Sequence, residues 1–122
     1  MMLILYVILA VALGSSGDGL NNRGVQTWGH LLRGLEVATL IWLPFLFNLS
    51  AINEGAALFA SYICIRISLF DYIRNLTAGQ PLFYMGGKNW WDLTLAKVYP
   101  SGLLFARFIF MVAGVGTILK YL

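Results

Sequence analysis

Five ionisable side chains of this sequence lie inside or at the edge of apolar segments, where a charge is unfavourable. An arginine at the centre of a membrane helix costs about 2.5–3.5 kcal/mol on insertion scales, so such a group is expected to have a partner or a function. Arginines that converge could bind an anion such as a phosphate headgroup or a carboxylate, and a carboxylate there could carry protons. The candidate polar site comprises His30, Glu36, Arg66, Asp71 and Arg74.

The spacing of these residues also allows a simpler interpretation, in which each charge is paired locally. Arg33 precedes Glu36 by three residues, and Asp71 precedes Arg74 by the same interval. Residues three apart are neighbours on a helix surface, so both pairs are predicted to form intrahelical salt bridges. Arg66 is then expected to pair with Asp71 or Glu36. The sequence favours this local pairing over a dedicated site.

Motifs for metal binding and for the common hydrolytic reactions are absent. His30 is the only histidine, and it lies six residues before Glu36, so the two do not share a helix face. Without an HExxH motif or a close cluster of histidines and carboxylates, we predict no metal and no cofactor, and an ordinary hydrogen bond for His30. There is no GxSxG motif for a serine nucleophile. A non-enzymatic role is favoured, and an enzyme is left open.

Composition identifies the solvent of this chain as the lipid bilayer. Of the 122 residues, 60% are hydrophobic and 11% are charged, against roughly 25% charged in a typical soluble domain. A small soluble domain has a large surface to cover with polar groups, and eight Lys/Arg with five Asp/Glu are too few for this. The basic residues are scattered singly, which excludes a nucleic-acid partner and favours lipid headgroups.

The apolar segments predict an all-α integral membrane protein with four transmembrane helices in a bundle. A spanning helix needs roughly 20 apolar residues, and the single domain, residues 1–122, has room for four. The polar stretch from Asp18 to Thr27, rich in glycine and asparagine, predicts the first loop. The helices are expected at about 1–17, 27–49, 55–75 and 102–122.

The first segment has two interpretations. Its apolar core, residues 1–13, is short enough for a signal peptide, but no Lys or Arg precedes it. Signal peptides normally carry such a charge, so a retained short helix is favoured. In the last segment, Arg107 and Lys120 are expected to extend to the membrane interfaces.

The third connection is predicted to contain a short amphipathic helix at about 89–99, lying in the membrane interface. Asn89 is a suitable N-cap, and Trp90 and Trp91 suit headgroup depth as interface anchors.

A separate pattern concerns helix packing. Small residues recur every four positions in the third segment, which lets another helix approach closely, within one chain or between copies in a homo-oligomer. The ridge consists of Ala56, Ala60, Cys64 and Ser68.

The distribution of charge predicts the topology. With four spans, the first and third loops share one side and hold most of the basic residues: Arg23, Arg33, Arg74, Lys88 and Lys97. The opposite side carries Lys120 and the acidic Glu54. The positive-inside rule places loops one and three in the cytoplasm and both termini outside, in a bacterial inner membrane or a virus-associated one.

Three functional hypotheses follow. The first is a non-enzymatic, oligomeric structural or accessory membrane component, with holin-like assembly as one version. The second is a membrane-embedded enzyme or a lipid-headgroup or anion-binding protein, with its polar site at the cytoplasmic interface. The third is a small transporter or channel in which Glu36 and Arg66 line the path.

Overall fold

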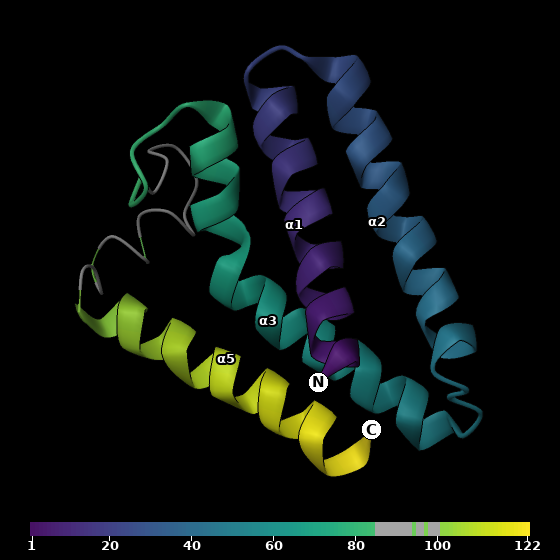
Figure 1. The fold of residues 1–122 in the computed structure, drawn as a ribbon. Helices are drawn as coiled ribbons and strands as arrows, with labels where there is room; N and C mark the ends of the chain where they lie inside the picture. The colour runs from purple at the N-terminus through teal and green to yellow at the C-terminus, as the bar shows by residue number, and fades with distance from the viewer. Residues whose placement is uncertain (85–93, 95–96, 98–100) are drawn as a thin grey trace.

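The computed structural model describes residues 1–84, 94, 97 and 101–122, and helices are the only regular secondary structure within that part of the chain. The predicted all-α class is therefore confirmed for these residues. The elements are α1 (Met2–Asn22), α2 (Gln26–Leu46), α3 (Ile52–Ala78) and α5 (Ser101–Tyr121) (Figure 1).

Three of these helices are long and apolar enough to cross a membrane: α1, α3 and, within α5, Leu104–Tyr121. α2 has the same length as α1, 21 residues, but does not belong to this group. Its first half carries His30, Arg33 and Glu36, which lower its apolar character.

The packing order of the helices is α2–α1–α3–α5. α1 packs against both α2 and α3, α5 packs along α3, and α1 touches α5 only slightly. Figure 1 shows α1 between α2 and α3, with both termini near the end that holds the α2–α3 connection. The α1–α2 connection lies at the opposite end. The predicted bundle of four transmembrane helices is not confirmed.

The first loop is much shorter than predicted, because α1 continues through Asp18 to Asn22. Gly19, one of the glycines that suggested a loop, and Gly17 just before the predicted loop are instead places where helices touch. A Cβ on Gly17 would lie 2.7 Å from the carbonyl oxygen of Gly29 in α2, and one on Gly19 would lie 2.6 Å from the carbonyl oxygen of Arg74 in α3. Small residues allow this close approach in membrane helices. The chain then reverses in three residues, with Gly24 at a φ of 89°.

Side chains and one glycine define the ends of α3. The Glu54 carboxylate accepts hydrogen bonds from the backbone amides of Ser50 (2.9 Å) and Ala51 (3.0 Å) and so caps the first turn. At the other end, Gly79 has a φ of 71°, the left-handed conformation that commonly ends a helix. Buried Asn75 donates hydrogen bonds to two carbonyl oxygens of the returning chain, those of Leu82 (3.0 Å) and Tyr84 (2.7 Å).

The ridge of small residues on α3 is used in part within this chain. A Cβ on Gly114 of α5 would lie 3.1 Å from the Cys64 Cβ, and the Ser68 hydroxyl lies 2.9 Å from the carbonyl oxygen of Arg107. Cys64 and Ser68 therefore face α5, whereas Ala56 and Ala60 are exposed.

The interfacial helix predicted over residues 89–99, with Trp90 and Trp91 as its anchors, lies outside the described residues except for Thr94 and Lys97.

Candidate functional site

Charged and polar side chains from α1, α2 and α3 meet in one network, which we name the inner cluster. Arg33 pairs with Asp18, and Arg66 pairs with Glu36. The Tyr62 hydroxyl donates a hydrogen bond to Glu36 and accepts one of 2.6 Å from Arg66. Arg66 also approaches Asp18 at 4.0 Å, so that one arginine connects two carboxylates from two other helices. The inner cluster comprises Asp18, Arg33, Glu36, Tyr62 and Arg66.

Exposure within the inner cluster decreases from Arg33 to Glu36. The Arg33 side chain is 47% exposed, whereas the Glu36 side chain is only 5% exposed. The Glu36 carboxylate lies against Gly14 of α1, where any larger residue would leave no room for it. A Cβ on Gly14 would overlap the carboxylate. A buried carboxylate without partners is strongly unfavourable, and Arg66 and Tyr62 supply partners to that of Glu36.

A second group of charges, the outer cluster, joins α3 to α5. Asp71 pairs with Arg107 at 2.5 Å and with Arg74 at 3.4 Å. Arg107 is buried, and its guanidinium carbon lies 4.4 Å from the centroid of the Tyr72 ring. The Nε of Arg74 is buried and has no hydrogen-bond partner among the described residues.

The aromatic ring of Phe70 connects the two clusters. The guanidinium carbons of Arg66 and Arg74 lie 4.6 Å and 5.6 Å from its centroid, within the range of cation–π attraction. Across both clusters, three carboxylates face four guanidinium groups, which leaves one positive charge unmatched among the described residues.

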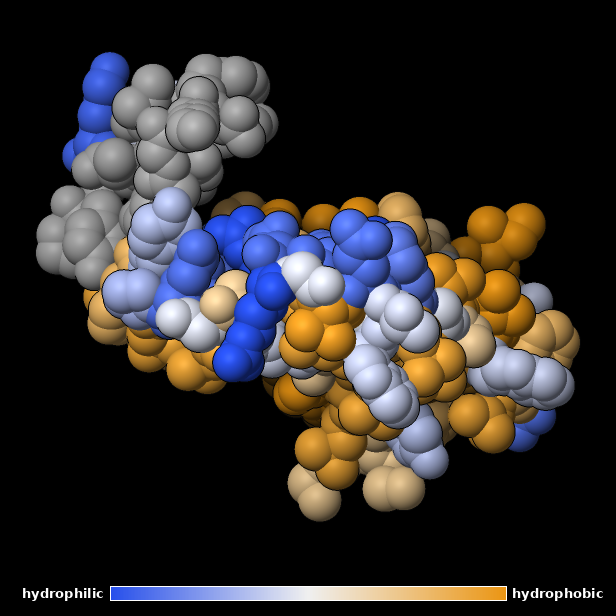
Figure 2. Space-filling view, turned by 90° about the horizontal axis from the view of Figure 1, so that it is seen from above, coloured by the Kyte–Doolittle hydropathy of each residue, from blue (hydrophilic) through white to orange (hydrophobic). Residues whose placement is uncertain are grey.

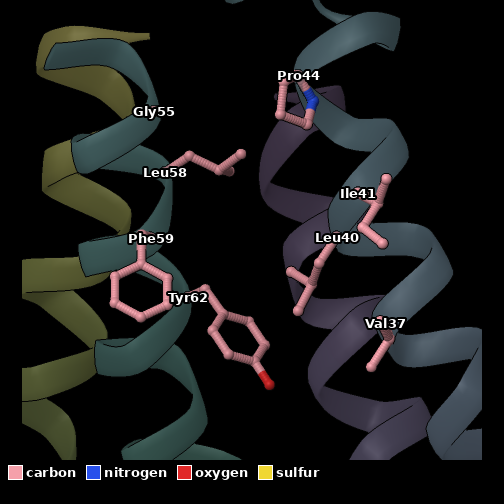
Figure 3. Close-up of a pocket in the computed structure, with 8 residues that line it drawn as sticks. All are labelled: Val37, Leu40, Ile41, Pro44, Gly55, Leu58, Phe59 and Tyr62. Carbon is pink, nitrogen blue, oxygen red and sulfur yellow. The ribbon is translucent and has the colours of Figure 1, made fainter. Parts of the chain in front are cut away.

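An apolar groove of about 320 Å³ lies between α2 and α3, beside the inner cluster (Figure 3). Figure 3 shows α2 and α3 on its two sides and α1 behind them, with Pro44 and Gly55 at one end and Val37 and Tyr62 at the other. Tyr62 belongs both to this groove and to the inner cluster. The lining residues are Val37, Leu40, Ile41, Pro44, Gly55, Leu58, Phe59 and Tyr62.

A shallower hollow of about 270 Å³ continues along the same helix, lined by Arg66, Ile67, Phe70 and Asp71. Phe59, Tyr62, Arg66 and Phe70 follow one another at intervals of three or four residues, so they share one face of α3. The groove and the hollow share no lining residue, but they adjoin where Arg66 of the hollow donates a hydrogen bond to the Tyr62 hydroxyl of the groove. The groove is mainly apolar, whereas the hollow contains the charges of Arg66 and Asp71.

The predicted pairing of Arg33 with Glu36 is wrong. Arg33 contacts Asp18 of α1, and Glu36 contacts Arg66 of α3. Both charges of α2 are neutralised by neighbouring helices, because Glu36 points into the protein while Arg33 remains half exposed. Glu36 was one of the two partners expected for Arg66.

The other predicted site residues divide between the outer cluster and the surface. The predicted contact of Asp71 with Arg74 is present. His30 is exposed and takes part in neither cluster.

Four residues of the clusters were not predicted as site residues: Asp18, Arg33, Tyr62 and Arg107. Asp18 was assigned to a loop, and Arg107 was expected to extend to the membrane interface rather than to be buried. Tyr62 lies four residues before Arg66, a spacing that places the two side chains together on a helix. That spacing was the available signal for Tyr62.

The polar residues are unevenly distributed over the molecule. Figure 2 looks onto the end that holds the α1–α2 connection, and hydrophilic residues form a band across it with apolar residues on both sides. No group of three or more metal-ligating side chains occurs among the described residues. In comparisons with known proteins, the chain matches no family model, no curated protein sequence and no solved structure.

Proposed function

We propose that this chain is a polytopic membrane protein that binds a lipid of the surrounding bilayer along α3. The observation that carries the proposal is that the apolar groove adjoins the charged clusters at Tyr62, which lines the groove and contacts both Glu36 and Arg66. An amphiphile needs such an arrangement, with an apolar channel for its chain and polar groups for its head. Because the groove opens between α2 and α3, a chain can enter it from the bilayer.

The dimensions of this face suit a lipid. Phe70 and Gly55 are separated by about 22 Å along the axis of α3, at 1.5 Å per residue. Half of the hydrocarbon core of a bilayer is about 15 Å thick. A headgroup beside Phe70 therefore places the end of an acyl chain near Phe59, which lines the groove and lies about 16 Å from Phe70 along the axis of α3. The headgroup then lies in the C-terminal half of α3, toward Ala78.

We propose further that α2 is a fourth transmembrane helix and that both termini face outwards. Its charges Arg33 and Glu36 are matched by partners on α1 and α3, which reduces the cost of placing them in the membrane. Arg23 lies in the α1–α2 connection, and Arg74 of α3 lies beside Gly19, near the same end of α1. The positive-inside rule then makes that end cytoplasmic, in a bacterial inner membrane or a virus-associated one.

Cysteine accessibility tests this topology. In a Cys64→Ser background, we expect Asn53→Cys to react with a membrane-impermeant maleimide on intact cells. Gly24→Cys should react only after the cells are permeabilised, because α2 separates the two positions. Equal reactivity of both positions on intact cells would show that α2 does not cross the membrane.

The groove itself is tested by filling it. Gly55 lines the groove, and nothing lies within 4 Å of a Cβ placed there, so Gly55→Leu adds bulk to the groove without crowding at the Cβ. We expect native mass spectrometry from mild detergent to show co-purified lipid on the unchanged protein and to show most of it lost from Gly55→Leu. Gly116→Leu is the matched control, since Gly116 on α5 also faces open space, and it should retain the lipid. An unchanged protein that carries no lipid would refute the proposal.

The same spectra test the oligomeric structural or accessory role, which includes holin-like assembly. That role is supported by the exposed small residues Ala56 and Ala60, which offer a close-packing surface to another copy. It requires more than one chain per particle. A strictly monomeric species would count against it and leave lipid binding unaffected.

A further inference from the structure

We infer that the headgroup bound beside α3 is an anionic phosphate, as in a lipid whose phosphodiester carries the net charge, and that Arg74 is the residue that selects it. This inference rests on the proposed lipid binding and adds the chemistry of the head. The site is the hollow lined by Arg66, Ile67, Phe70 and Asp71, together with the adjoining Arg74.

The charge count gives the sign of the ligand. The two clusters hold one guanidinium group more than carboxylates, among the described residues. A phosphodiester carries a single negative charge and so matches the excess. A zwitterionic headgroup carries an ammonium group as well as its phosphate and has no net charge. It would therefore leave the excess positive charge of the two clusters unmatched.

The guanidinium group that lacks a carboxylate of its own is that of Arg74 rather than that of another arginine. Arg66 has Glu36 as a close partner, and Arg33 has Asp18. Asp71 lies closer to Arg107, at 2.5 Å, than to Arg74, at 3.4 Å. Arg74 therefore has the weakest neutralisation, and its buried Nε has no hydrogen-bond partner in the described part of the chain.

The arrangement of the two accessible arginines suits a phosphate. The side chains of Arg66 and Arg74 are 25% and 26% exposed, and both guanidinium groups lie against the ring of Phe70. A guanidinium held in place by an aromatic contact loses less freedom on binding and presents several donors to the oxygens of one anion. A phosphate beside Phe70 is within reach of both arginines.

The location of the hollow selects a membrane lipid as the source of the phosphate. The hollow lies on the side of α3 and adjoins the apolar groove where Arg66 contacts Tyr62, so a ligand that occupies both has an acyl chain. The apolar groove alone would accept the chain of any lipid. Discrimination between headgroups must therefore come from the arginines.

The test is a competition between two lipids that have the same acyl chains. The purified protein is mixed with equal amounts of phosphatidylglycerol, which is anionic, and phosphatidylcholine, which is zwitterionic, and the bound lipids are counted by native mass spectrometry. We expect the unchanged protein to prefer the anionic lipid by about tenfold, the lower range for a hydrogen bond to a charged group. Arg74→Gln should bind the two lipids within about twofold of each other.

Two further variants make the result specific. Arg74→Lys keeps the charge but loses the planar donors, so it should retain a reduced preference for the anionic lipid. Arg23→Gln removes an exposed cation from the α1–α2 turn and should leave the preference unchanged. Arg66 is unsuitable for this test because it also neutralises the buried Glu36.

The outcomes separate this inference from the proposal it rests on. Equal binding of both lipids by the unchanged protein overturns the inference and leaves lipid binding intact. A preference that persists in Arg74→Gln overturns the assignment to Arg74. The absence of either lipid from the unchanged protein defeats the inference and the proposed function together.

Discussion

Replacing Arg66 with methionine should lower the free energy of unfolding by about 3–5 kcal/mol, the range found when one partner of a buried ion pair is removed. The reason is that the Glu36 carboxylate, 5% exposed, would lose its charged partner while remaining inside the protein. Neutral hydrogen bonds between membrane helices average only about 0.6 kcal/mol. A loss of about 3–5 kcal/mol in the free energy of unfolding would therefore show that Glu36 and Arg66 form a charge pair shielded from water.

The measurement is equilibrium unfolding in mixed micelles, followed by circular dichroism as the fraction of denaturing detergent rises. Lys120→Met is the control, because Lys120 lies in the last turn of α5 and its described contact is with the ring of Tyr121. It should change stability by less than about 0.5 kcal/mol. An Arg66→Met loss as small as the control would contradict the buried pair.

A double variant separates the pair from its parts. Glu36→Leu combined with Arg66→Met replaces both charges with apolar side chains, and such replacements are often neutral or stabilising. We expect the double variant to recover most of the stability lost in Arg66→Met. The single variant Glu36→Leu completes the comparison. If the losses of Glu36→Leu and Arg66→Met simply add in the double variant, Glu36 and Arg66 act independently.

The helices follow from the sequence because the bilayer requires every spanning backbone group to be hydrogen-bonded within its own segment. Apolar stretches of sufficient length therefore indicate α1, α3 and α5 directly. α2 is the borderline case, since its suitability for the membrane depends on whether other helices neutralise Arg33 and Glu36. That information is tertiary and lies outside the helix itself.

The partners of the site residues could be predicted only where they are close in sequence. The contact of Asp71 with Arg74 follows from a spacing of three residues on one helix. Glu36 and Arg66 are 30 residues apart, and their contact depends on Gly14 of a third helix, which leaves room for the carboxylate. The Glu36–Arg66 pair could therefore be recognised only once the positions of α2, α3 and Gly14 of α1 relative to one another were known.

Glycine in the first segment was misinterpreted for a physical reason. In a soluble chain, a run of glycine and asparagine indicates a turn, because these residues adopt backbone conformations that others avoid. Between membrane helices, the absence of a side chain is instead what permits close packing. Gly19, which was predicted to lie in the loop, shows the second use, since it lies inside α1 against the backbone of α3. Gly17 lies in the same way against the backbone of α2.

Gly17→Ala should therefore destabilise the protein by about 1–3 kcal/mol, the cost of adding atoms to a well-packed contact. The new Cβ would lie 2.7 Å from the carbonyl oxygen of Gly29 and 3.2 Å from the backbone nitrogen of Arg33. Neither backbone atom can rotate away, so α2 must shift as a whole. The shift would also disturb the Arg33–Asp18 pair. Unfolding in mixed micelles measures the loss.

Gly34→Ala separates packing from helix propensity. Gly34 also lies in a helix, but nothing is within 4 Å of a Cβ placed there. Alanine is favoured over glycine in a helix interior by about 1 kcal/mol, so this variant should be as stable as the unchanged protein or more so. Gly17→Ala has the same propensity gain and should still lose stability, because the contact with α2 outweighs it. If both variants gained stability, α1 and α2 would not be in backbone contact at Gly17, and the inner cluster would lose the geometry that brings Asp18 to Arg33.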